Sequence, residues 1–162
     1  MTGLLFAAYE MNHFKDEYQK AVIENAKAFA TALQEEGLEV AGDPEINFTE
    51  THQVIVHVGY AQGAKVAKKM EENNIIVNYQ ATPVEEGFTA SGALRLGVSE
   101  MTRFGMKQSD FQDLAAFMAD VIKNDSNIKK EIQLFRNRFQ EMQYCFKEED
   151  FQDVAVSLIG SL

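Results

Sequence analysis

The stretch ASGALRLGVSEMTRFG, residues 90–105, is the most informative part of the sequence because it reads as a strand followed by a tight turn. Arg95 lies between two leucines there, and successive strand residues point to opposite faces. The arginine therefore shares its face with Ala93 and Gly97, whose small size leaves room for a ligand. A guanidinium pairs with a carboxylate through two parallel hydrogen bonds, which a lysine cannot make. The pattern predicts either a carboxylate-binding arginine or an arginine on the solvent-facing side of a half-buried strand.

The segments before this stretch alternate between helical and strand patterns. A helix is predicted where apolar residues recur at spacings of three and four, and a strand where they alternate. Gly37 is placed to end the first helix, and Pro83 lies in a loop over 79–89. In chain order the predicted elements are a helix over 11–36, a strand over 38–41, a strand over 53–58, a helix over 62–73, a strand over 75–78 and a strand over 90–96.

The segments after it are mainly helical. We expect a capped turn over 99–103, a helix over 111–123, a second helix over 127–146 and amphipathic turns over 151–159. The apolar residues of the second helix alternate spacings of four and three, which predicts packing on the domain or on a partner chain. These residues are Ile128, Ile132, Phe135, Phe139, Met142 and Phe146.

Together these elements predict an α+β fold. We expect a two-layer small domain with a mostly antiparallel sheet of about four strands packed with helices. A long N-terminal helix and a helical C-terminal tail flank this domain. The expected division is 1–36 for the first helix, 37–125 for the α+β domain and 126–162 for the tail.

Composition and charge disfavour several classes of function. The formal net charge is −10, which argues against a nucleic-acid-binding or anionic-membrane surface. No apolar run approaches the ~20 residues that span a bilayer, and the apolar start lacks the preceding basic residues of a signal peptide. The single cysteine, Cys145, excludes an internal disulfide framework, so we expect a cytoplasmic protein.

Two histidines belong to the best predicted strand, in the sequence THQVIVHV. His52 precedes the strand and His57 lies within it. We interpret both as hydrogen-bonded structural residues, with a ligand-binding or catalytic role as the alternative. No further His, Cys or paired carboxylate lies at metal-ligand spacing from either one, so no metal site is predicted.

From Ile75 onward, the order of these features resembles the C-terminal domain of serine hydroxymethyltransferase and its close relatives. These are fold-type-I enzymes that use pyridoxal phosphate (PLP). A weaker resemblance extends from about Tyr9 to Phe117, and it makes residues 1–36 an interdomain helix. The shared features are a Val-Asn strand end at Asn78, a loop that reaches Pro83, the pair Ser91-Gly92, an Arg-x-Gly at Arg95 to Gly97, and Thr102-Arg103 before a glycine.

The resemblance implies a transferase of serine and glycine, and hence of amino-acid and one-carbon metabolism. It implies that Arg95 binds the α-carboxylate of the amino-acid substrate. Asn78, Gln80 and Ser91 are then expected in the loop that contacts substrate or folate, with tetrahydrofolate as a second ligand. Arg103 is expected to be structural and to hold down the turn after the strand. The family works as a dimer, so a homodimer is expected.

We do not expect the complete chemistry of a PLP enzyme from this chain. The family holds PLP on a lysine in a Thr-His-Lys-like stretch of a large domain. Neither that stretch nor a glycine- and serine-rich phosphate loop occurs in this sequence. We therefore expect no catalytic and no PLP-binding residue here, a large PLP-binding domain outside the chain, and no activity from the chain alone.

Departures from the family pattern leave alternatives open. Gly-Val-Ser-Glu over 97–100 replaces the usual Gly-Thr-Pro-Ala, and Tyr79-Gln80 stands where the family has an asparagine that meets folate. One alternative is a folate-independent PLP-dependent aldolase or transferase that acts on another β-hydroxy amino acid. Another is a non-catalytic binding or dimerisation module.

Overall fold

A computed structural model of the chain describes residues 2–83 and 90–147, together with positions 150, 156 and 160. Its helices are α1 (Thr2–Glu35), α2 (Gly63–Glu72), α3 (Ser99–Arg103), α4 (Gln108–Asn124) and α5 (Lys129–Arg136), with a short 3-10 helix at Pro44–Ile46. Its strands are β1 (Glu39–Val40), β2 (Gln53–His57), β3 (Asn78–Gln80) and β4 (Ala93–Gly97).

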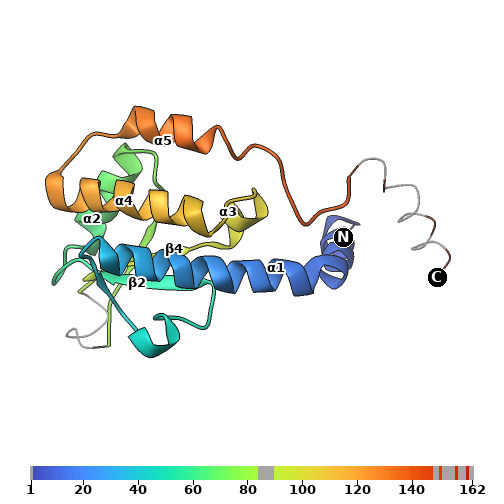
Figure 1. The fold of residues 1–162 in the computed structure, drawn as a ribbon, viewed down its shortest axis with the longest axis horizontal. Coiled ribbons are helices and arrows are strands. Elements are labelled where there is room, and N and C mark those ends of the chain that lie inside the picture. The colour runs from blue at the N-terminus through green and yellow to red at the C-terminus, as the bar shows by residue number, and fades with distance from the viewer. Residues whose placement is uncertain (1, 84–89, 148–149, 151–155, 157–159, 161–162) are drawn as a thin grey trace.

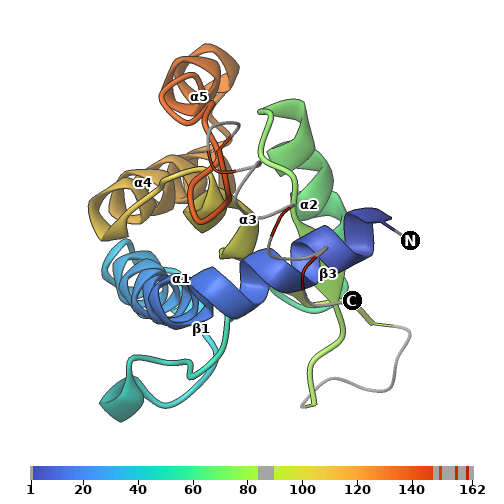
Figure 2. The same cartoon turned by 90° about the vertical axis from the view of Figure 1, so that its right-hand side faces the viewer.

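The four strands form a single sheet in the order β1-β2-β4-β3, and each neighbouring pair is antiparallel. The helices lie together over one face of this sheet (Figure 1, Figure 2). This arrangement is the two-layer α+β domain that the sequence predicts, with its long N-terminal helix.

Alternation along β2 and β4 determines which side chains meet the helices. Val54 and Val56 of β2 are buried, and across the ladder they pair with Leu96 and Leu94 of β4. Successive strand residues point to opposite faces, so the residues between them lie on the other side of the sheet. The valines and leucines therefore form the floor of the hydrophobic core.

The core is closed by α1 and α4, which lie side by side over the sheet (Figure 1). Phe29 of α1 and Phe111 of α4 are both buried, and their ring centroids are 5.3 Å apart. After α1, Gly37 adopts a φ of +75°, a left-handed conformation that glycine reaches without strain. No helix in the described part of the chain is long and apolar enough to cross a bilayer.

The first helix begins at Thr2, which corrects the predicted start at position 11. The apolar residues before position 11 show too short a pattern to distinguish a helix from another element. Contact with a distant segment stabilises them as a helix. Phe6 packs against Phe146, with ring centroids 6.1 Å apart.

The strand predicted over 75–78 is also corrected, because β3 covers Asn78–Gln80 instead. Asn74 adopts a left-handed φ of 63°, and the N–H of Ile75 donates to the carbonyl of Met70 at 2.9 Å. These residues complete the end of α2. The chain therefore pairs with β4 only from Asn78 onward.

The helix predicted over 127–146 is wrong beyond Arg136, where α5 ends. The Arg136 side chain donates to the carbonyl of Phe139, and the chain then continues without regular structure to Phe146. A helix rises about 1.5 Å per residue and an extended chain about 3.3 Å. The open form therefore reaches the N-terminal end of α1 (Figure 1). The turns predicted over 151–159 lie outside the described residues, apart from position 156.

Candidate functional site

Arg95 lies in the middle of β4, on the face of the sheet opposite the helices. It is exposed, while its neighbours Leu94 and Leu96 are buried in the core. The register places it between Ile55 of β2 and Asn78 of β3. We call the sheet face that carries Arg95 the open face. The side chain of Arg95 has no hydrogen-bond or ion-pair partner within residues 2–83 and 90–147, so its guanidinium is available to a ligand.

A depression of about 360 Å³ surrounds this guanidinium. Both polar and apolar residues line it. Its lining consists of His52, Gln53, Ile76, Val77, Asn78, Arg95 and Gly97. The structure thus brings together Arg95, Asn78 and His52 from the residues singled out in the sequence.

The other candidates lie outside the lining of the depression. Gln80 and His57 pair with the same residue of β4, Ala93, one step along the open face from Arg95. Ser91 precedes β4, and its carbonyl accepts a hydrogen bond of 2.7 Å from the N–H of Gly63. Its backbone therefore holds the start of α2 against the sheet.

Sequence reasoning missed the apolar side of the depression, which Ile76 and Val77 provide. Ile76 is 80% exposed, which is unusual for an isoleucine in a folded domain. The prediction of a strand over 75–78 gave no sign of this role, because in the structure Ile76 lies two residues before β3 and lines the depression beside Arg95.

Gly97 forms an unobstructed part of the depression. A Cβ atom placed there would meet no atom within 4 Å, so the core does not require a glycine at this position. The absence of a side chain instead leaves space two residues from Arg95 on the open face.

Arg103 has the structural position expected for it. It ends α3, and its Nη2 lies 2.6 Å from Oε2 of Glu10 on α1. Within the described ranges, no group of three His, Cys, Asp or Glu side chains is arranged to hold a metal ion.

The chemistry of the depression fits an anionic group better than a covalently bound cofactor. An arginine, a histidine and two amides line it, but no lysine of the described ranges does. A guanidinium and amide groups suit a carboxylate. A Schiff base with PLP requires a lysine amine, which this lining does not supply.

Comparison with solved structures gives the class of enzyme that this domain resembles. The fold is similar to that of L-threonine transaldolase from Pseudomonas fluorescens in its internal aldimine state. The TM-score is 0.80 and the sequences are 32% identical, over 92% of this chain and 36% of the transaldolase chain.

Comparison of sequences then gives the family. A family model described as serine hydroxymethyltransferase matches residues 4–118. The chain belongs to the serine hydroxymethyltransferase family.

Curated relatives from archaea are similar over most of this chain. The serine hydroxymethyltransferase of Pyrobaculum aerophilum is 44% identical over 85% of the chain, and that of Staphylothermus marinus is 38% identical over 100% of it. These alignments cover 33% and 39% of the respective relatives. The chain therefore spans little more than a third of the length of these relatives.

Proposed function

We propose that this chain is the C-terminal domain of a PLP-dependent enzyme of the serine hydroxymethyltransferase type, and that Arg95 binds the α-carboxylate of its amino-acid substrate. The observation that carries the proposal is the unpartnered guanidinium of Arg95 among the described residues, at a depression on the open face. Membership of the family supports the class of reaction.

Bound PLP would supply the electron sink that weakens a bond at the substrate Cα. The residues of this chain would bind and orient the amino acid. Two parallel hydrogen bonds from Arg95 fix the plane of the carboxylate and so restrict rotation of the Cα substituents. Ile76 and Val77 limit access of water from one side, and the Asn78 amide offers a further donor and acceptor.

We place the lysine that would carry PLP outside the residues that line the depression. The test is an absorbance scan of the purified chain with PLP, followed by borohydride reduction and peptide mapping. We expect no Schiff-base band and no stoichiometrically labelled lysine. A single fully labelled lysine would mean that the chain holds its own cofactor site, and the proposed division of roles would be wrong.

The role of Arg95 can be tested in a chimera in which residues 4–147 of this chain replace the matching part of the Pyrobaculum aerophilum relative. Arg95→Lys keeps the charge but loses the paired geometry, so we expect KM for L-serine to rise by about tenfold to a hundredfold. Arg138→Lys is the matched control at a half-exposed arginine and should leave KM unchanged. An unchanged KM in Arg95→Lys would refute the assignment.

A folate-independent reaction on another β-hydroxy amino acid is the second candidate. The resemblance to a threonine transaldolase favours it, as does Gln80 where the family has a folate-contacting asparagine. The same chimera separates the two: cleavage of L-serine that depends on tetrahydrofolate supports the first function, and folate-independent cleavage of L-threonine alone supports the second. Inactivity of a folded, PLP-loaded chimera would favour a binding or dimerisation module.

Cytoplasmic location and assembly as a homodimer belong to the same proposal. The lone cysteine supports the former. Membership of the family supports the latter. Light scattering of the purified chain at several concentrations measures its self-association.

A further inference from the structure

The segment after α5 crosses the molecule as an open chain that is fastened at both ends. We call residues 137–147 the strap. Near its start, Arg138 makes an ion pair with Asp110 of α4, at an N–O distance of 2.5 Å. Further along, the N–H of Gln143 donates to the carbonyl of Arg103 at 2.6 Å.

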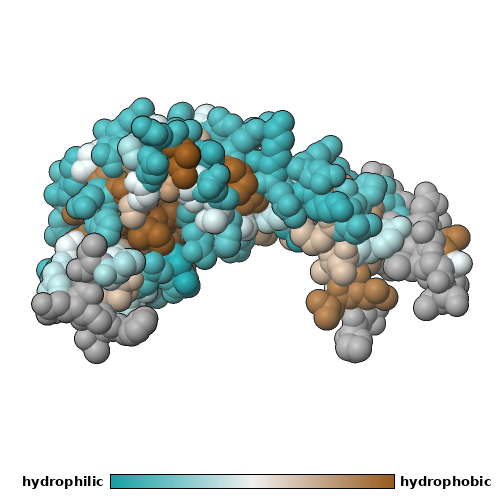
Figure 3. All heavy atoms as spheres, turned by 90° about the horizontal axis from the view of Figure 1, so that it is seen from below, coloured by the Kyte–Doolittle hydropathy of each residue, from teal (hydrophilic) through white to brown (hydrophobic). Residues whose placement is uncertain are grey.

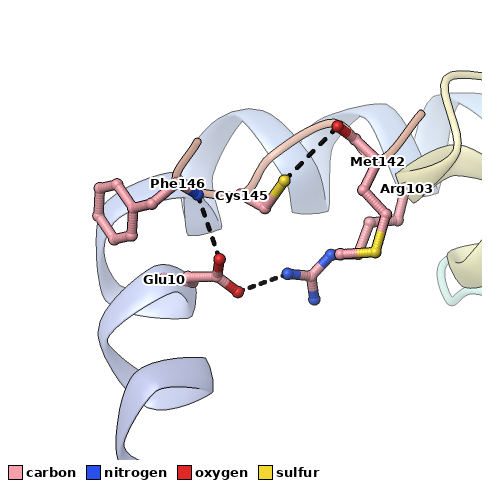
Figure 4. Close-up of polar contacts among 5 residues, drawn as sticks. All are labelled: Glu10, Arg103, Met142, Cys145 and Phe146. Atoms are coloured by element: carbon pink, nitrogen blue, oxygen red, sulfur yellow. Dashed lines mark hydrogen bonds and ion pairs between the residues drawn. The ribbon is translucent and has the colours of Figure 1, made fainter. Parts of the chain in front are cut away.

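Glu10 of α1 joins the far end of the strap to α3 (Figure 4). Its Oε2 accepts from Nη2 of Arg103 at 2.6 Å, and its Oε1 accepts from the backbone N–H of Phe146 at 3.1 Å. Glu10 is only 7% exposed, and a buried carboxylate is costly unless it is paired. Both of its oxygens are paired by this arrangement.

Aromatic contacts reinforce the same junction. The ring of Phe146 lies between 5.2 and 6.1 Å, centroid to centroid, from four rings on one side of α1. These rings belong to Phe6, Tyr9, His13 and Phe14. The strap thus covers the apolar side of the first turns of α1.

The end of α1 beyond this junction projects from the body of the molecule, with apolar side chains on its surface (Figure 3). Leu4 and Leu5 are 75% and 57% exposed. The core residues of α1 begin only at Val22. Among the described residues, the strap and Arg103 therefore contribute tertiary support to the first turns.

The middle of the strap does not pack on the core. A hollow of about 830 Å³ lies between the strap, α1 and the turn that joins α3 to α4. Phe14, Met106 and Tyr144 are among its lining residues. Gln140, Glu141 and Met142 of the strap are exposed.

We propose that the strap is a releasable clasp and that Glu10 is its latch. Arg103 holds both parts, through its side chain to Glu10 and through its carbonyl to Gln143. Loss of the Glu10 contacts therefore weakens the hold on the first turns of α1 and on the end of the strap together, because Glu10 bonds to both Arg103 and Phe146. The start of the strap remains fixed by the buried ring of Phe139, so the strap opens the hollow by swinging from there once the Gln143 hydrogen bond and the contact of Tyr144 with Tyr18 also give way.

Hydrogen–deuterium exchange of the 162-residue chain, read by mass spectrometry, tests this coupling. Glu10→Gln removes the charge with little change of shape. We expect exchange to accelerate by about tenfold both in residues 2–14 and in residues 141–147, because a charge-assisted contact is lost from each. Exchange in the core helix over 108–124 should stay unchanged.

Glu17→Gln is the matched control, because Glu17 is exposed two turns farther along α1 and makes no ion pair with any described residue. Glu17→Gln should leave the exchange rates of residues 2–14 and 141–147 unchanged. If Glu10→Gln does not fold, Phe146→Ala removes the ring contacts and is expected to accelerate the same two segments. Acceleration of one segment without the other, or of neither, would overturn the proposal.

Discussion

Gly97 determines how much space remains beside Arg95. It is part of the depression, yet a Cβ atom there would touch nothing, and its φ lies outside the left-handed region. The backbone therefore accepts other residues, and a side chain on this face would project toward the ligand space. The small size of this residue has its physical rationale in access to the guanidinium rather than in folding.

We predict that Gly97→Leu raises KM for the amino acid by about tenfold in the chimera, because its side chain fills the depression. Gly97→Ala should have a much smaller effect. Thermal melting of the alanine variant should match that of the parent, since its Cβ atom meets no atom within 4 Å, and the leucine variant should melt close to it because position 97 is exposed. Equal effects of alanine and leucine, or a large loss of stability, would contradict this reading.

Asp125 provides a pH-dependent contribution to stability. Lys69 donates a hydrogen bond to it at 2.5 Å, and that hydrogen bond and positive charge hold the pKa of the carboxyl below its usual value of 3.8. A pKa that is lower in the folded state adds stability above the unfolded value, which is lost as pH falls through the folded value. The contribution is small, because the carboxyl is exposed to solvent.

Asp125→Asn is a clean test, since asparagine also tolerates the left-handed φ of 56° at this position. We expect its melting temperature to be slightly below that of the parent at about pH 7, and this difference to shrink as pH falls below the unfolded pKa and through the lower folded one. Circular dichroism melts across this range measure the difference. A difference in melting temperature that stays the same at the lowest pH would show that the charge of Asp125 does not cause it.

At the scale of elements, α3 is a short helix held in place by polar contacts with α1. The buried Asn25 donates from Nδ2 to Oγ1 of Thr102 at 3.0 Å and to the carbonyl of Met106 at 2.9 Å. Tyr18 donates from its hydroxyl to the carbonyl of Ser99 at 3.0 Å. These bonds fix the position of the chain directly after β4, and thus the end of the strand that carries the candidate site.

We predict that Asn25→Ala lowers the free energy of unfolding by about 1–3 kcal/mol, because it leaves buried polar groups without partners. Asn124→Ala is the control at an exposed amide on α4, whose side chain bonds only to Asp120 among described residues, and it should cost much less. Urea denaturation gives both values. If Asn25→Ala lowers the free energy of unfolding no more than Asn124→Ala does, water replaces the hydrogen bonds that the Asn25 side chain makes.

The predicted helices and strands match the structure where the local sequence pattern and the tertiary environment favour the same conformation. Alternation around Val54 and Leu96 located the central strands, because one face of each is buried in the core. The sequence failed at β3, where a helix-terminating turn takes up Ile75, and beyond Arg136, where helical spacing continues but the chain is open. In both places long-range contacts override local preference.

The residues of the candidate site also divide into those that the sequence alone indicates and those that only the tertiary structure shows. Arg95 could be singled out because a charged residue interrupts an apolar strand. The contribution of Ile76 could not, since it depends on which residues of β3 pair with β4. Glu10 gave no local signal either, because its partners lie about a hundred positions farther along the chain.

For the whole molecule, the described helices pack on the other face of the sheet, and the open face leaves Arg95 exposed. Ile76 is the most exposed large apolar residue on it, at 80%. An exposed apolar side chain beside the arginine that we propose as a carboxylate ligand is suited to contact with further protein or with substrate. Its contribution should therefore appear only when the rest of an enzyme is present.

We predict that Ile76→Asp changes the melting temperature of this chain little, because an exposed substitution typically costs within about 0.5 kcal/mol. In the chimera the same change should lower the melting temperature and the activity, since the charge would be buried without a partner. Ile46→Asp, at an isoleucine that is 40% exposed in the 3-10 helix, is the control and should have little effect in either protein. Equal effects of Ile76→Asp in the chain and the chimera would show that the open face stays uncovered.

The strand order also has a consequence for folding during synthesis. β2 borders β1, which has only two residues, and β4, whose last residue is Gly97. The sheet therefore cannot assemble while the ribosome has yet to release the segment that carries Arg95. Until then β2 lacks its longer neighbouring strand, and closing so long a loop slows the pairing. The strand that presents the guanidinium is thus also the one on which the nascent domain depends to become compact.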